Sequence, residues 1–187
     1  VAKRLQKSIP NSVILNQYSN EDNPLAHEYT TGPEIIDAIV ADYAAHSYSS
    51  RKSSGKVDAV VMGAGTGGTI TGVSRAIKKV HNPDCVIVGV DPKGSVLAYP
   101  DNLNKTTDDS VYQVEGIGLP PTVDKWIKLG DDEAFPATMR LIKEEALLVG
   151  GSSGTALAGA LNWLKSPEGK ECAATEGKNI VVVLPDG

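Results

Sequence analysis

Residues 60–70, Val-Val-Met-Gly-Ala-Gly-Thr-Gly-Gly-Thr-Ile, run from consecutive hydrophobic side chains into a loop built mainly of glycine and threonine. Hydrophobic, β-branched runs without polar side chains are typical of a parallel strand that is covered on both faces. A glycine-rich loop between such a strand and a helix lets the backbone wrap an oxyanion, because its N–H groups and the helix dipole supply positive potential. The stretch therefore predicts a strand, an anion-binding loop and a helix in succession.

Similar hydrophobic runs alternate with amphipathic segments along the rest of the chain. We expect a polar loop at 16–31, a helix that opens at residues 30–34, further helices at 70–80, 135–148 and 155–164, and strands at 13–15, 57–62, 85–90 and 179–184. Strands that alternate with helices predict an α/β fold, in which an open, mostly parallel sheet is flanked by helices in three αβα layers.

The composition excludes several classes of function. The 187 residues, 41% of them hydrophobic, suffice for one sizeable core. The net charge is -5, and Lys and Arg are scattered along the chain, so no basic patch is expected that would bind nucleic acid or an anionic membrane. No hydrophobic run reaches the ~18 residues of a membrane span, and the two cysteines lack metal-ligand spacing. We therefore expect a cytoplasmic protein that binds small molecules and no metal.

The glycine-rich loop is compatible with more than one ligand. Gly63-x-Gly65-x-x-Gly68, with Asp91 closing the next strand, matches a dinucleotide fingerprint in which the acidic residue binds the ribose. Thr66 and Thr69 add hydroxyl donors, which the several oxygens of a terminal phosphate can use. A tight turn without a ligand is the third interpretation. The hydroxyls favour a monophosphate.

A second stretch resembles the first. Residues 147–155, Leu-Leu-Val-Gly-Gly-Ser-Ser-Gly-Thr, again run from hydrophobic residues into a small-residue loop at the start of a helix. Two such loops at strand ends fit one ligand that has polar groups at opposite ends.

Six short motifs identify a family. They are NPLAH (23–27), TTGPEI (30–35), GTGGT (65–69), GVDPKGS (89–95), EGIG (115–118) and GGSSG (150–154). In this order they resemble the fold-type II pyridoxal-phosphate enzymes of the cystathionine β-synthase and cysteine synthase family, over essentially the whole chain. The resemblance implies that the cofactor phosphate binds to Gly65, Thr66, Gly67, Gly68 and Thr69. It further implies that Ser152 hydrogen-bonds the pyridine nitrogen and that Gly116 lies beside the substrate.

The resemblance also implies a reaction. In a β-replacement, L-serine loses its hydroxyl and L-homocysteine adds to give cystathionine, which makes the enzyme a lyase of transsulfuration and cysteine biosynthesis. A neutral hydroxyl such as Ser152 holds the ring nitrogen protonated less well than a carboxylate, which suits loss of a β-substituent. Three alternatives stay open: a cysteine synthase that uses O-acetylserine and sulfide, a non-catalytic truncated homologue, and an NAD-binding module.

The chain also departs from the family pattern. No lysine lies in the Ser-x-Lys-x-Arg context of the family's Schiff-base lysine, so no catalytic residue is assigned here and the chain is expected to be inactive alone. After Gly118 several residues of the family pattern are missing. We expect a piece of a longer, homodimeric protein, with residues 1–32 ending a smaller substrate-side subdomain and 33–187 forming the larger, phosphate-binding one.

Four other residues receive structural interpretations. His27 is expected to form hydrogen bonds at the surface rather than to catalyse. Trp126 and Trp163 are expected to pack on amphipathic helices, and Asp91 to be structural and close to the site.

Overall fold

The computed structural model describes residues 1–45, 52–105 and 123–186. Within these ranges the chain forms a parallel sheet with the strand order β3-β2-β1-β4. The strands are β1 (Ala59–Gly63), β2 (Val86–Pro92), β3 (Lys125–Leu129) and β4 (Ile180–Val182). Because all pairs are parallel, the carboxyl ends of the strands lie at one edge of the sheet.

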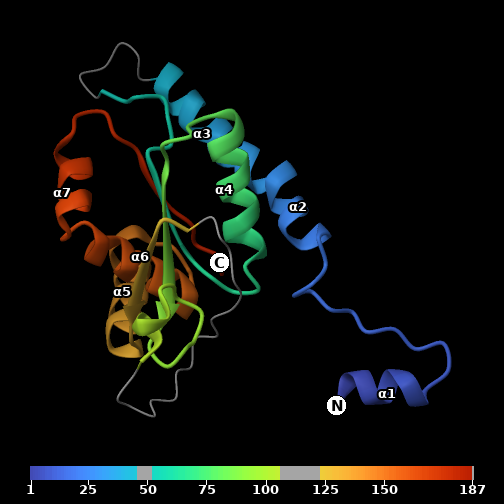
Figure 1. Ribbon diagram of the computed structural model, residues 1–187. Coiled ribbons are helices and arrows are strands. Elements are labelled where there is room, and N and C mark those ends of the chain that lie inside the picture. Colours follow the sequence, from blue (N-terminus) through green and yellow to red (C-terminus); the bar gives the residue numbers. More distant parts are fainter. Residues whose placement is uncertain (46–51, 106–122, 187) are drawn as a thin grey trace.

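Helices cover both faces of this sheet, as expected for the α/β class (Figure 1). On one face lie α3 (Thr31–Ala45) and α4 (Gly68–Val80), and on the other α5 (Asp131–Glu145), α6 (Gly151–Trp163) and α7 (Pro167–Ala174). Successive residues of β1 serve the two cores in turn, since Val60 packs with the first group and Val61 with the second. The predicted three-layer αβα arrangement is confirmed.

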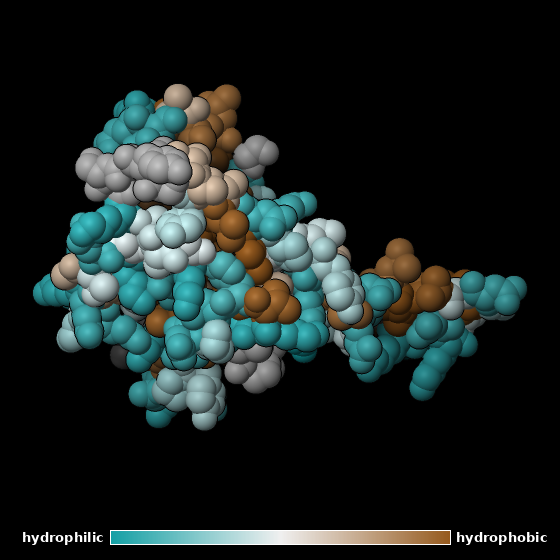
Figure 2. Space-filling model, turned by 90° about the horizontal axis from the view of Figure 1, so that it is seen from above, coloured by the Kyte–Doolittle hydropathy of each residue, from teal (hydrophilic) through white to brown (hydrophobic). Residues whose placement is uncertain are grey.

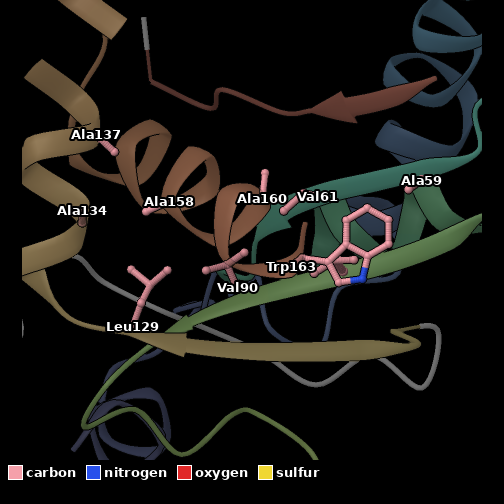
Figure 3. Close-up of a cluster of buried hydrophobic side chains, with 10 residues drawn as sticks. Ala59, Val61, Val90, Leu129, Ala134, Ala137, Ala158, Ala160 and Trp163 are labelled. Carbon is pink, nitrogen blue, oxygen red and sulfur yellow. The ribbon is translucent and has the colours of Figure 1, made fainter. Parts of the chain in front are cut away.

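The core beneath α5 and α6 is built largely from small residues. Ala134 and Ala137 of α5 and Ala158 and Ala160 of α6 are buried, and these short side chains let the two helices pack closely against each other and the sheet. The Trp163 ring, 3% exposed, lies between α6 and the strands (Figure 3). This packing holds the start of α6 at the carboxyl edge of the sheet.

The N-terminal segment contributes one helix to the body and one outside it. α2 (Asp22–Tyr29) lies along α4, whereas α1 (Ala2–Ser8) stands apart from the sheet (Figure 1). Hydrophobic side chains are exposed on this outer arm, which is coloured brown in places in Figure 2, and Leu15 is 91% exposed.

Several predicted elements are wrong. Residues 13–15 form no strand, because they lie on the outer arm without a neighbouring strand among the described residues. The expected loop at 16–31 contains α2. Trp126 belongs to β3, not to a helix. The helix expected at 135–148 starts at Asp131, where the Glu133 carboxylate accepts a hydrogen bond from the Gly130 N–H, and it ends at Glu145 before Ala146 (φ 56°).

Candidate cofactor site

A cavity of about 310 Å³ opens at the carboxyl edge of the sheet, and both glycine-rich loops line it. Residues 63–69 reach it directly from the end of β1, and Ser152 and Thr155 reach it from the start of α6. The structure therefore brings Gly65, Thr66, Gly67, Gly68 and Thr69 together with Ser152 around one space. Gly116 lies outside the described residues.

The first loop presents an open helix terminus to this cavity. Gly67 precedes α4 with φ 82°, a left-handed conformation that glycine adopts without steric cost. Gly67 occupies the N-cap position and has no side chain that could accept a hydrogen bond from the first N–H groups of α4. The first N–H groups of a helix have no partner within it and carry the positive end of the dipole. The loop at 65–69 is therefore suited to an anion.

The second loop differs, because its helix terminus is already occupied. The half-buried Asp186 carboxylate accepts hydrogen bonds from the backbone N–H of Ser152 at 3.2 Å and of Ser153 at 3.0 Å, and also from the Ser153 hydroxyl. Burial alone raises the pKa of Asp186, but the hydrogen bonds from these serines outweigh it and hold the pKa below its ordinary value. A second anion at this terminus would meet a carboxylate, which leaves Ser152 suited to a neutral group.

The threonines of the first loop are held by α2. Asn23 Nδ2 donates to Thr66 Oγ1 at 2.7 Å. His27 Nε2 lies 3.1 Å from Thr69 Oγ1, and His27 Nδ1 lies 2.9 Å from Thr31 Oγ1. His27 thus forms hydrogen bonds, as predicted, but it is half-buried against the loop. The NPLAH motif contains Asn23 and His27, and this was the only signal in the sequence that could have linked α2 to the site.

Asp91 lies beneath the edge of the sheet and does not line the cavity. Its side chain is 0% exposed, and Oδ2 accepts hydrogen bonds from Lys128 Nζ at 2.7 Å and from the Ala98 N–H at 3.1 Å. Its predicted structural role is confirmed. A carboxylate so enclosed is not presented to a ribose, which removes one support of the dinucleotide interpretation.

The cavity walls fit a phosphorylated aromatic ring. Met62, Val90 and Val183 provide apolar surface, and no acidic side chain among the described residues lines the space. The donors of residues 65–69, which are suited to an anion, line the cavity from β1 and α4, and Ser152 supplies a hydroxyl from α6. The volume is at the lower end of the ~300–1,000 Å³ usual for small-molecule sites. No lysine of the described part of the chain lines the cavity.

Neither a cluster of metal ligands nor a membrane-spanning helix is found among the described residues. They contain no group of three or more His, Cys, Asp or Glu placed to hold a metal ion. None of their helices has both the length and the hydrophobicity needed to cross a membrane.

A family model and several known enzymes are similar to this chain over its whole length. A family model described as pyridoxal-phosphate dependent enzyme matches residues 1–186. A cystathionine beta-synthase of Dictyostelium discoideum is 45% identical over 194 aligned positions, which cover 100% of this chain and 34% of the relative. Enzymes of the same name from Rattus norvegicus (45% identical, 30% of the relative) and Saccharomyces cerevisiae (43%, 35%) also match over 100% of this chain.

The chain thus spans about a third of the length of these relatives. The alignments cover 194 or 195 positions against 187 residues here, so the relatives carry residues that this chain lacks. The deletion predicted after Gly118 falls outside the described residues and stays a prediction.

Proposed function

Because this chain belongs to the family of pyridoxal-phosphate-dependent enzymes, we propose that it forms the cofactor-phosphate side of the active site of a longer β-replacement enzyme. The observation that carries the proposal is the pairing of an open helix terminus at 65–69 with an anion-occupied terminus at Ser152, around one cavity. Because the two helix termini differ, the phosphate of one ligand would bind at the first and its ring at the second.

Each proposed contact has a physical reason. The N–H groups of residues 65–69 and the hydroxyls of Thr66 and Thr69 would bind the phosphate oxygens. Ser152 would hydrogen-bond the ring nitrogen, and Met62 and Val90 would exclude water from the space between. When bound, pyridoxal phosphate supplies the electron sink through which an amino acid can lose its α-proton and a β-substituent.

The proposed reaction joins L-serine and L-homocysteine to cystathionine, in transsulfuration and cysteine biosynthesis. Identity of 43–45% to cystathionine beta-synthases over the whole chain supports it. No lysine of the described residues lies in the cavity, so we propose that this chain alone is inactive. We further propose that the longer protein is cytoplasmic and homodimeric. Residues 1–32 would then end the smaller, substrate-side subdomain.

Binding is tested first with the 187-residue chain and pyridoxamine 5′-phosphate. This probe carries no aldehyde, so surface lysines cannot capture it covalently. We expect saturable binding that inorganic phosphate displaces and NAD does not. Displacement by NAD, with no effect of phosphate, would replace the proposal by the dinucleotide alternative. No binding of either would favour the non-catalytic homologue.

The reaction is tested in the longer protein. Serine with homocysteine and O-acetylserine with sulfide are offered in parallel, and the products are identified by mass spectrometry. Cystathionine from the first pair supports the proposal. Cysteine from the second pair alone would assign the chain to the cysteine synthase alternative.

A further inference from the structure

Asn23 lies between the proposed phosphate loop and the segment that leads to α1. Its side-chain Nδ2 donates to Thr66 Oγ1 at 2.7 Å and to the backbone carbonyl of Gln17 at 3.0 Å. Both amide protons therefore have acceptors, and one of these acceptors is a hydroxyl that lines the cavity. The contact spans 43 residues of sequence and joins α2 to the loop.

This contact fixes what the Thr66 hydroxyl can do. A hydroxyl has one proton to donate and two lone pairs that accept. Since Asn23 donates to Thr66 Oγ1, the proton of Thr66 stays available, and no acceptor for it is found among the described residues. A phosphate dianion only accepts hydrogen bonds, so it needs Thr66 as a donor.

The glycine at position 68 belongs to the same arrangement. A Cβ built there would overlap Asn23 Oδ1 and also approach Nδ2 of the same side chain. Gly68 lies in α4 with an ordinary helical backbone, so alanine would be acceptable there apart from this contact. The absent side chain makes room for the Asn23 amide beside Thr66.

We propose that Asn23 is a positioning residue for cofactor binding, which acts by holding Thr66 as a hydrogen-bond donor to the phosphate. This inference rests on the proposed function of residues 65–69. It adds to the site a residue from outside the two glycine-rich loops. It also gives a reason for glycine at position 68, where a Cβ would overlap Asn23.

The decisive variant is Asn23→Asp, which keeps the shape of the side chain and removes both donors. The carboxylate would accept the hydrogen bond that the Thr66 hydroxyl otherwise donates to the phosphate, and it would place a negative charge beside that phosphate. We expect the affinity for pyridoxamine 5′-phosphate at pH 8 to fall at least about tenfold, as for loss of a hydrogen bond to a charged group. The matched control, Asn102→Asp on the exposed η1 turn (Asp101–Asn104), should bind like the wild type.

The pH profile separates positioning from a general structural effect. The ratio of the dissociation constants of Asn23→Asp and the wild type should be largest at pH 8 and fall toward pH 4. The phosphate loses one negative charge at pH ~6, and the new carboxyl regains its proton at pH ~4. His27, Glu21 and Arg75 lie around the same part of the site, and measuring the wild type at each pH removes their contribution. A ratio that stays constant with pH would overturn the inference.

A double-mutant cycle tests the role of Gly68. Gly68→Ala should weaken binding by displacing Asn23, but it should cost little more in an Asn23→Ala background, where the new Cβ has room. Additive effects would contradict the arrangement, and thermal unfolding checks that each variant is folded. If the wild-type chain does not bind the probe, the proposed function fails. If the wild type binds and Asn23→Asp binds equally well, only this inference fails.

Discussion

The carboxylate of Asp186 accepts a hydrogen bond from the backbone N–H of Ser153 at 3.0 Å, so the N-terminus of α6 already holds an anion. The N-terminus of α4 has no such partner among the described residues. The two loops resemble each other as sequences, GTGGT against GGSSG, and both line the same cavity, yet a carboxylate occupies only the second helix terminus. The difference comes from a residue that follows β4, far along the chain from both loops.

Replacing Asp186 by Asn should destabilise the fold at neutral pH. An N-cap contact contributes about 0.5–2 kcal/mol, and the amide that replaces the carboxylate would carry no charge toward the dipole. The folded-state pKa of Asp186 is lowered from 3.8, so its stabilisation is present above that value and is lost as the pH falls through the lower folded-state pKa. Urea unfolding at pH 7 and pH 3 should therefore give a difference between the two proteins that shrinks with acid.

The control for this prediction is Asp37→Asn, which changes an exposed carboxylate on α3. It should leave the unfolding free energy nearly unchanged at both pH values. An Asp186→Asn protein as stable as the wild type at pH 7 would mean that the α6 terminus does not need its anion.

Removing the Thr69 hydroxyl should weaken binding of any phosphate. Thr69→Val keeps the shape and loses a donor to a charged group, a contact of about 1.5–3 kcal/mol or roughly 10–100-fold in affinity. Both inorganic phosphate and pyridoxamine 5′-phosphate should be affected, as measured by equilibrium dialysis. Thr69→Ser retains the hydroxyl and should bind like the wild type. Equal loss in Thr69→Val and Thr69→Ser would assign the effect to packing with His27 instead.

Ser152→Ala should give a different pattern. If Ser152 contacts the ring and not the phosphate, the affinity for pyridoxamine 5′-phosphate should fall about 2–10-fold, as for one neutral hydrogen bond of ~0.5–1.5 kcal/mol. The affinity for inorganic phosphate should stay unchanged, since the α6 terminus binds Asp186. Loss of phosphate affinity in this variant would show that the two ends of the site have been assigned wrongly.

The parts of the fold that the sequence predicts well are those encoded by neighbouring residues. The strand predicted at 57–62 is β1 at Ala59–Gly63, and the one predicted at 85–90 is β2 at Val86–Pro92, because a continuous hydrophobic run marks a strand covered on both faces. The loop that follows β1 is equally local, since its glycines and threonines lie within five residues.

The parts that the sequence does not predict depend on distant partners. β3 reads Lys-Trp-Ile-Lys-Leu, and two lysines in five residues argue against a buried strand. Lys128 is nevertheless enclosed, because the carboxylate that it pairs with stands on the neighbouring strand β2. The contact between Asn23 and Thr66 is similar, since neither residue type indicates the other from 43 positions away.

That pairing of Lys128 with Asp91 leads to a last prediction. Lys128 Nζ also donates to the carbonyl of Ser95 at 2.7 Å, so the ion pair ties β3 to the turn that follows β2 beside the cavity. The side chains of Lys128 and Asp91 are 11% and 0% exposed. Removing one partner of such a pair leaves an uncompensated buried charge, which costs about 3–5 kcal/mol. Lys128→Met should lower the unfolding free energy by about that amount, as measured in urea at pH 7. Asp91→Asn in the same chain should restore part of the loss, since no buried charge is then left.

The matched control is Lys93→Met, which breaks an exposed pair with Glu133 at 3.5 Å and should cost less than about 1 kcal/mol. Equal losses in the two single lysine variants would mean that burial of the Lys128 pair carries no energetic consequence.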